Sequence, residues 1–359
     1  MAPDPGPQPR PGATRARGGG EALLLSRLAS RLRWEYGLTV LAVAIVLLGI
    51  SVSSQFLTSG NLFYLCISVG EVAIMTLPLT FIVITGEIDL SVASTLGLAS
   101  ALVGDLWSHG WPMPLIIPFV LAVGVATGAF NGLLVTRVGL PSLAVTIGTL
   151  TLYRGIATIL LGPNTISNFP PSYTSIGVDP VPHTFLSYSV LVFLILAVVF
   201  GVTLHFTPFG RSLYAIGANR EAALFAGIRV RRVKTLLFIV SGVVCSAAGI
   251  LYTFRLSTAV QNNGLGDELS VVAIVLLGGV SIFGGTGSIV GVVLAVFVFA
   301  GLQNALFLTN FNELALGIVT GGLLLVSVLV PNASSFLRRA RDLLKRREVR
   351  GRAAAARRV

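Results

Sequence analysis

TPFGRSLYAIGANREAALFAGIRVRRVK, residues 207–234, is the longest polar and charged stretch between the apolar segments of this chain. It contains six basic residues and one acidic residue, Glu221. On both sides of it lie apolar runs long enough to cross a lipid bilayer as helices. The stretch therefore separates two groups of membrane spans, and the sequence predicts an all-α, polytopic membrane protein.

A short helix is predicted in the middle of this stretch. Asn219 is a favourable N-cap, Glu221 lies in the first turn, and Gly227 suits the residue that follows a helix end. Three small or apolar residues share one face at helical spacing: Ala222, Phe225 and Ala226. Two interpretations are open. The helix is either a docking surface for a cytoplasmic partner or a membrane-surface hairpin whose arginines bind anionic lipid headgroups.

The composition and the placement of charge support the membrane assignment. Of 359 residues, 54% are hydrophobic and 11% are charged, whereas a soluble domain has roughly 25% charged residues. The net charge is +11, and 22 of the 25 Lys and Arg residues lie in the blocks 1–35, 205–234 and 336–359. This is the positive-inside pattern of a membrane protein, so the charge indicates orientation and contact with membrane lipid rather than nucleic-acid binding.

Ten apolar runs are candidate spans, and several are interrupted. They cover residues 36–52, 62–84, 90–106, 115–135, 142–161, 187–204, 235–254, 269–282, 289–308 and 313–330. Ten spans, with six before the basic stretch, place that stretch and both termini in the cytoplasm. Some runs are shorter than the ~20 residues that a straight span needs, and breaks such as Pro141 and Gly278-Gly279 predict broken or re-entrant helices. The membrane domain is expected over residues 35–335, between a disordered basic cytoplasmic tail at 1–34 and a basic cytoplasmic tail at 336–359.

A few polar residues lie inside the apolar runs. Glu71 is in the middle of a span, where an ionisable group is costly and is a functional candidate by default. It either faces a path for a polar solute or is hydrogen-bonded within the bundle, and Arg154 either pairs with it or extends toward the outer surface. Asn131, Gln303 and Asn304 are further candidates for the path, although hydrogen bonding between helices is the commoner use of such residues.

The sequence gives no support for catalysis or for a bound cofactor. Cys66 and Cys245 lie within apolar spans, and no group of His, Cys and carboxylate residues has the spacing of metal ligands. Lysine occurs only at Lys234 and Lys345, and neither follows a Gly-x-x-x-x-Gly loop. No nucleophile and base are paired. We therefore expect no catalytic residue, no metal site and no nucleotide site in this chain.

Ordered motifs in the chain resemble a known family. The resemblance covers roughly residues 36–331 and is to the permease subunits of bacterial ABC importers of monosaccharides, of the ribose, xylose, arabinose, rhamnose and autoinducer-2 type. The motifs are TGEIDLSVAS (85–94), GLPSLAVTIGTLTLYRG (139–155), FGRSLYAIGANREAALFAGI (209–228), GGVSIFGGTGSIVG (278–291) and LQN (302–304). The chain departs from the commonest pattern at Glu87 and Ala93, where glycine is usual.

The resemblance implies a transport subunit rather than an enzyme, located in the bacterial cell membrane. Such a permease pairs with a second copy or a sister permease, receives a sugar from an external binding protein, and is driven by two cytoplasmic subunits that bind ATP and Mg²⁺. The coupling segment implied by the family comprises Gly217, Asn219, Glu221, Ala222, Phe225 and Gly227. The family motifs at the inner loops comprise Gly86, Asp89, Ser91, Gly284, Gly285 and Gly287.

Three other functions are compatible with parts of the sequence. A self-contained channel or secondary transporter needs an ion relay, for which Glu71 and Arg154 are the available residues. A membrane-embedded enzyme needs a cluster of His, Asp or Cys near one interface. An ABC permease for branched-chain amino acids is a related branch of the same family, and the I-D-L-S motif favours sugars over amino acids.

Overall fold

The structure is a computed structural model that describes residues 15–309, 317–318, 321–322, 325 and 329, with side chains from Trp34 onward. These residues form helices and no strands, which confirms the predicted all-α class. The helices are α1 (Arg15–Val52), α2 (Ser59–Ile84), α3 (Val92–Ser108), α4 (Met113–Leu133), α5 (Ser142–Leu161), α6 (Pro171–Val178), α7 (Tyr188–Phe206), α8 (Pro208–Ala218), α9 (Arg220–Phe225), α10 (Val230–Leu256), α11 (Asp267–Leu277) and α12 (Ile289–Leu308). A π-helical turn, η1 (Leu134–Val138), continues α4.

Seven of the described helices are long and apolar enough to cross a membrane. They are α2, α5, α7, α10, α12, residues 34–52 of α1, and α4 together with η1. The six apolar runs predicted before the basic stretch each coincide with a helix, although α3, with 17 residues, falls just below span length. The tenth predicted run, 313–330, lies largely outside the described residues.

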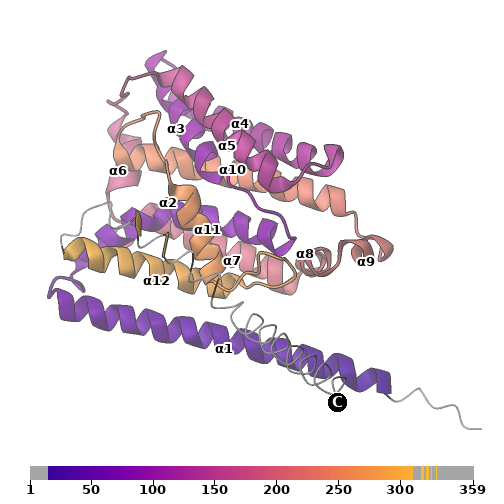
Figure 1. The fold of residues 1–359 in the computed structure, drawn as a ribbon. Helices are drawn as coiled ribbons and strands as arrows, with labels where there is room; N and C mark the ends of the chain where they lie inside the picture. Colours follow the sequence, from indigo (N-terminus) through magenta and orange to yellow (C-terminus); the bar gives the residue numbers. More distant parts are fainter. Residues whose placement is uncertain (1–14, 310–316, 319–320, 323–324, 326–328, 330–359) are drawn as a thin grey trace, which may run out of the picture.

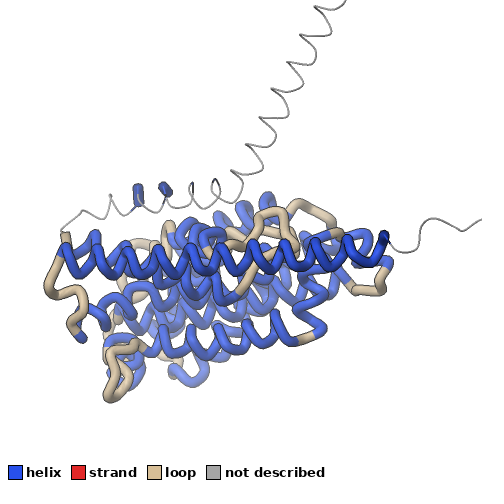
Figure 2. The backbone as a smooth tube through the Cα atoms, turned by 90° about the horizontal axis from the view of Figure 1, so that it is seen from below, coloured by secondary structure: helices blue, strands red, loops and turns tan. Residues whose placement is uncertain are grey.

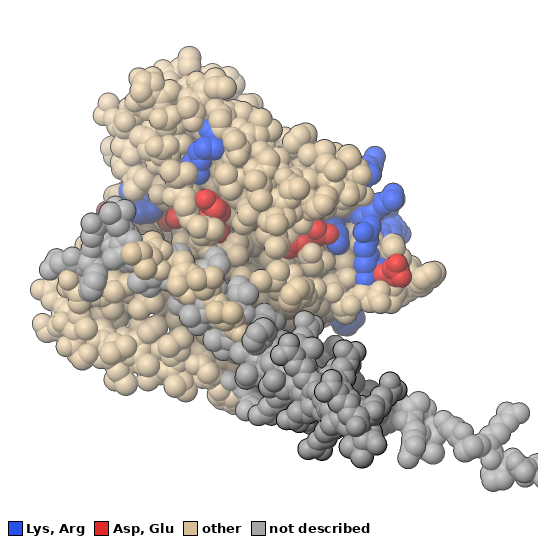
Figure 3. Space-filling view, viewed as in Figure 1, with Lys and Arg blue, Asp and Glu red and all other residues tan. Residues whose placement is uncertain are grey.

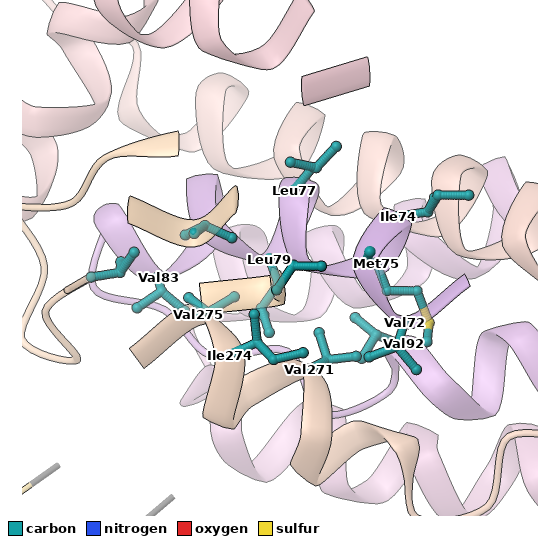
Figure 4. Packing of buried hydrophobic residues seen from close by; sticks show 14 of the residues in the cluster. Val72, Ile74, Met75, Leu77, Leu79, Val83, Val92, Val271, Ile274 and Val275 are labelled. Atoms are coloured by element: carbon teal, nitrogen blue, oxygen red, sulfur yellow. The ribbon is translucent and has the colours of Figure 1, made fainter. Parts of the chain in front are cut away.

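α2 is the central helix of the bundle, and α1 is peripheral. The most apolar part of α2 is 89% buried, whereas that of α1 is 17% buried. Side chains of α2 and α11, among them Met75, Leu79 and Ile274, pack into one apolar cluster (Figure 4). α2 packs against α7, α10, α11 and α12, so it has neighbouring helices on several sides. α1 lies along the lower edge of the bundle in Figure 1 and therefore crosses its near face in Figure 2, which is seen from below.

Glycines allow α4 and α10 to approach closely. An added Cβ at Gly128 would lie 2.3 Å from the Phe238 carbonyl oxygen, and one at Gly242 would lie 2.1 Å from the Gly124 carbonyl oxygen. No larger residue fits these positions without separating the helices. Small residues at helix contacts are the usual means of packing in lipid, where the hydrophobic effect does not hold helices together.

α11 is too short to cross the membrane. Its 11 residues extend about 16 Å at 1.5 Å per residue, roughly half the hydrocarbon thickness. It follows an irregular segment, 257–266, and ends at Gly278, directly before Gly279 in a left-handed conformation (φ 81°). The break predicted at Gly278-Gly279 is therefore present, and the eighth predicted span is a half-helix.

The N-terminal part of the chain differs from expectation. We predicted a disordered tail over residues 1–34, but α1 continues back to Arg15. The leucines at 24, 28 and 32 recur every four residues, which is the spacing of one helix face, and the composition of the tail had obscured this repeat. Residues 1–14 and the predicted tail at 336–359 lie outside the described residues.

Candidate functional site

The short capped helix predicted within the basic stretch is present as α9. The Asn219 side-chain oxygen accepts a hydrogen bond from the Ala222 backbone N–H at 3.0 Å, as an N-cap does. Glu221 lies in the first turn, where its charge complements the helix dipole. Gly227 has the left-handed conformation (φ 82°) expected just beyond a helix end. These local contacts define the start and the end of α9.

α9 is anchored by one face and exposes a large aromatic side chain on the other. Ala223 is buried against Ile216 of α8 and Val230 of α10. Phe225 is 92% exposed and Leu224 is 50% exposed. An apolar pair of this size at the end of a short, anchored helix is typical of a surface that binds another protein.

Exposed arginines surround α9. Lys and Arg side chains gather at the end of the molecule formed by α8 and α9 (Figure 3). Five arginines of this region are exposed: Arg211, Arg220, Arg229, Arg231 and Arg232. The basic residues predicted to mark one side of the membrane are therefore gathered at one end of the molecule.

Three of the family motifs, 85–94, 209–228 and 278–291, meet at glycine positions near the end of α8. The backbone N–H of Gly285 donates to the Ile84 carbonyl oxygen at 2.8 Å. A Cβ added at Gly217, the penultimate residue of α8, would lie 1.9 Å from that oxygen and 2.3 Å from the Gly285 nitrogen. A Cβ added at Gly284 would lie 2.9 Å from the Gly86 nitrogen. The end of α8 is thus in backbone contact with the loops that follow α2 and α11. We call the five residues Ile84, Gly86, Gly217, Gly284 and Gly285 the glycine contact.

Side chains of the I-D-L-S motif attach the first inner loop to the surrounding helices. The Asp89 Oδ1 atom accepts from the backbone N–H and the hydroxyl of Ser91, at 2.9 and 2.6 Å. Ser241 of α10 donates to Asp89 Oδ2 at 3.1 Å, and Asn131 of α4 donates to Ser91 Oγ at 2.8 Å. The motif at 278–291 is also attached to α8, since the Tyr214 hydroxyl donates to the Gly287 carbonyl oxygen at 2.8 Å.

Glu87, one of the two residues at which this chain departs from the family pattern, forms an ion pair. Glu87 Oε1 contacts Lys234 Nζ at the start of α10. The Lys234 side chain is 9% exposed and that of Glu87 is 18% exposed, so water screens the pair only partly. The sequence shows the extra carboxylate at Glu87 but does not show that Lys234 is its partner. The clue was the only lysine of the basic stretch, which lies at its last residue.

A second connection that sequence analysis missed comes from α1. The Trp34 indole N–H donates to the Leu277 carbonyl oxygen at 3.0 Å, and the Ser288 hydroxyl donates to Glu35 Oε1 at 2.7 Å. The Trp34 ring also lies so close to Gly279 that a Cβ there would be 2.6 Å from it. α1 is therefore attached to the motif at 278–291, which in turn contacts α8.

Glu71 is paired inside the bundle, and Arg154 is not its partner. Glu71 is 1% exposed, and its Oε1 accepts from the Ser189 hydroxyl at 2.7 Å. Its Oε2 lies 3.1 Å from Arg255 Nε at the end of α10. Arg154 instead donates through Nη1 to the Asn263 carbonyl oxygen at 2.6 Å. The pairing of Arg154 with Glu71 is therefore wrong, because the irregular segment before α11 brings backbone acceptors to Arg154.

The uncharged polar candidates also bond within the bundle. Asn131 accepts from the Tyr153 hydroxyl at 3.3 Å in addition to its bond with Ser91. Asn304 of α12 and Asn61 of α2 exchange two amide hydrogen bonds, at 2.8 and 3.0 Å. Gln303 is half-buried. Among the described residues, no three His, Cys, Asp or Glu side chains are placed to hold a metal ion.

Comparison with known proteins identifies the family of this chain. Residues 61–328, about three quarters of the chain, match the family described as branched-chain amino acid transport system / permease component. This chain belongs to that family of ABC-importer permeases. The family is one of transport subunits, not enzymes. No solved structure matches the chain.

Curated relatives of this permease are importer permeases. It is 35% identical over 307 residues to the ribose import permease protein RbsC of Bacillus subtilis, covering 83% of this chain and 92% of the relative. It is 34% identical over 257 residues to the autoinducer 2 import system permease LsrC of Enterobacter sp. (strain 638), covering 70% and 74%. It is 30% identical over 328 residues to LsrD of Escherichia coli K12, covering 88% and 97%. These relatives are named for the import of ribose and of autoinducer 2, and the branched-chain amino acid alternative is not favoured.

Proposed function

We propose that this permease forms the path for a monosaccharide or similarly polyhydroxylated solute, and that separate cytoplasmic subunits hydrolyse ATP and bind to it at α9. The observation that carries this proposal is the glycine contact together with the exposed Phe225. A partner that moves α9 moves α8, and α8 has no space to approach the two loops without displacing them.

The mechanism follows from what each connection transmits. Ala223 attaches α9 to α8 and α10, so a push on Phe225 displaces all three elements as a unit. The glycine contact transmits the displacement to residues 85–91 and 278–288, which lead directly into α3 and α12. These helices lie within the bundle, so movement at the cytoplasmic end rearranges the membrane path. The chain itself performs no covalent chemistry.

The cargo and the assembly are proposed from the relatives and the motifs. The ribose and autoinducer 2 permeases named above match most of this chain, and the I-D-L-S residues of the motif at 85–94 favour sugars. We propose two permease subunits and two ATP-binding subunits per complex, with an external protein that delivers the sugar. ATP and Mg²⁺ would bind only to the ATP-binding subunits.

Orientation is proposed from charge. The exposed arginines around α9 support a cytoplasmic position for this end, and the same rule supports cytoplasmic termini. The segment 162–184 contains no Lys or Arg and lies between α5 and α7, so we assign it to the outer surface. The permease is then a multi-pass protein of the bacterial cell membrane.

The test is purification of the tagged chain in mild detergent from its native membrane. We expect an ATP-binding subunit to co-purify, and we expect Phe225→Asp to abolish this because a carboxylate would have to be desolvated at the docking surface. Ala222→Arg, on the same exposed face, should have the same effect. The matched control is Phe185→Asp, at a phenylalanine that is 45% exposed in the loop before α7, far from α9.

Retention of the ATP-binding subunit by both α9 variants would refute the assignment of α9. A wild-type chain that purifies alone, and still transports without ATP in liposomes, would refute the importer assignment as a whole.

A further inference from the structure

The start of the membrane-spanning part of α1 lies against the loop that joins α11 to α12. α1 and α12 are neighbours (Figure 1), and a Cβ added at Gly301 of α12 would lie 2.9 Å from the Ile45 side chain of α1. The loop itself, residues 278–288, has its two ends close together, since a Cβ added at Gly291 would lie 2.2 Å from the Gly278 carbonyl oxygen. One short stretch of α1 can therefore contact both ends of the loop.

Trp34 completes the end of α11. The last carbonyl groups of a helix have no partner within the helix and need one from outside it. The carbonyl oxygens of residues 274–276 accept from backbone N–H groups of the loop. The carbonyl oxygen of Leu277, the last residue of α11, accepts from the Trp34 indole N–H at 3.0 Å. The Trp34 ring also covers Gly279, where an added Cβ would lie 2.6 Å from it.

Glu35 holds the start of α12. Its Oε1 atom accepts from the hydroxyl of Ser288, the N-cap of α12, at 2.7 Å. The oxygen of the same hydroxyl accepts from the Gly291 backbone N–H at 3.1 Å. The serine is therefore oriented from both sides, and the Glu35 carboxylate lies where negative charge complements the helix dipole. Two adjacent residues of α1 thus bind the two ends of one loop.

The middle of this loop carries two residues of the glycine contact. The loop is closed by a hydrogen bond from the Ser281 N–H to the Thr286 carbonyl oxygen at 3.1 Å, and the Gly285 N–H donates to Ile84 at 2.8 Å. A loop whose ends can shift would absorb a push from α8 by changing its own shape. A loop held at both ends passes the push to the helix that follows it, which is α12.

We propose that Trp34 and Glu35 are positioning residues for transport, which hold the loop 278–288 so that a displacement of α8 reaches α12. They act through the loop, because they bind its ends while α8 contacts its middle. This inference rests on the proposed function, because it assigns these residues a role in the movement that α9 is proposed to receive. It makes α1, the most peripheral span, part of the coupling.

Hydrogen exchange tests this hold in the purified full chain, without ATP or partner subunits. Trp34→Phe keeps a ring and removes the indole donor, and Glu35→Ala removes the acceptor of the Ser288 hydroxyl. We expect the amides of residues 278–291 to exchange at least about fivefold faster in each variant, as the loss of a partly buried hydrogen bond implies. Glu35→Gln keeps an accepting oxygen and should exchange as slowly as the wild type.

The matched control is Trp111→Phe, at a tryptophan that is 42% exposed in the turn between α3 and α4. Its exchange over residues 278–291 should equal that of the wild type. Exchange at the wild-type rate in both Trp34→Phe and Glu35→Ala would overturn the hold on the loop, and so would equally fast exchange in the control.

The positioning role is tested by uptake per ATP hydrolysed in the reconstituted importer, with D-ribose, D-xylose and L-arabinose as the sugars. In the double variant of Trp34→Phe and Glu35→Ala we expect this ratio to fall at least about fivefold. Recovery of the ATP-binding subunit should not change, because α9 keeps its surface. Glu35→Gln alone should retain the wild-type ratio.

An unchanged ratio in the double variant would overturn the positioning role. Loss of the ATP-binding subunit from that variant would show a general structural role and would also overturn it. Failure of the proposed function looks different, because the wild-type chain would then bind no ATP-binding subunit or take up none of the sugars. The exchange measurement would still decide whether α1 holds the loop.

Discussion

Gly217→Ala tests whether the glycine contact transmits movement from α9 to the membrane path. The substitution adds one methyl group to a position in α8 where the backbone has helical geometry, so it does not strain the helix itself. That methyl group would lie 1.9 Å from the Ile84 carbonyl oxygen. Any effect therefore comes from the contact between α8 and the two inner loops.

The size of the effect follows from these distances. Real Cβ contacts are not closer than 3.0 Å, so the end of α8 must move away by about 1.1 Å (3.0 − 1.9) or the loops must move instead. Overpacking of this kind costs typically 1–3 kcal/mol. Loss of the 2.8 Å bond from Gly285 to Ile84 adds about 0.5–1.5 kcal/mol. The coupled arrangement is then disfavoured by roughly 2–4 kcal/mol, where about 1.4 kcal/mol is a factor of ten.

The assay is ATP-driven sugar uptake by the reconstituted importer, measured beside recovery of the ATP-binding subunit. We expect Gly217→Ala to lower uptake at least about tenfold. The matched control is Gly60→Ala, at another helical glycine, where no atom lies within 4 Å of the added Cβ. This control should transport normally, since alanine favours a helix over glycine by roughly 0.5–1 kcal/mol. Normal uptake by Gly217→Ala would refute the transmission route.

Three further predictions concern charge and topology. Arg255→Met should lower the free energy of unfolding of the purified chain by about 3–5 kcal/mol, because it leaves Glu71 buried without its partner. Adding Glu71→Gln to this variant should recover part of the loss. No recovery would mean that the ion pair is absent. Glu87→Lys and Lys234→Glu should each reduce uptake and together restore it; failure of the double variant would exclude a simple ion pair. Ser172→Cys should react with an impermeant thiol reagent outside intact cells, and reaction only after permeabilisation would reverse the topology.

The parts of the site that depend on neighbouring residues were predictable. α9 begins at an Asn219 side chain that binds a backbone N–H three residues later and ends before a glycine at φ 82°. Both interactions lie within one or two turns of helix, so the order of residues decides them. The membrane helices were predictable for a related reason, since the length of an apolar run decides whether it can span.

Side-chain partners between distant segments were not predictable in this way. Glu71 has opposite charges available at several positions, and only the packing of α2 against α7 and α10 places Arg255 beside it and leaves Arg154 elsewhere. The uncharged candidates Asn131 and Asn304 likewise bond to neighbouring helices. These residues were predicted to line the path because burying a polar group in lipid is costly. A hydrogen bond to a neighbouring helix removes that cost equally well.

The glycines show most directly what each level of description contributes. Gly86, Gly217, Gly284 and Gly285 were evident as motif residues, and left-handed glycine turns are a local property of the chain. Sequence by itself determined the all-α class, the six apolar helices before the basic stretch, the basic end, the capped helix and the family. Only tertiary structure decided that α8 touches both inner loops and that Lys234 meets Glu87, because these contacts join residues that only the packing of the helices brings within a few ångströms.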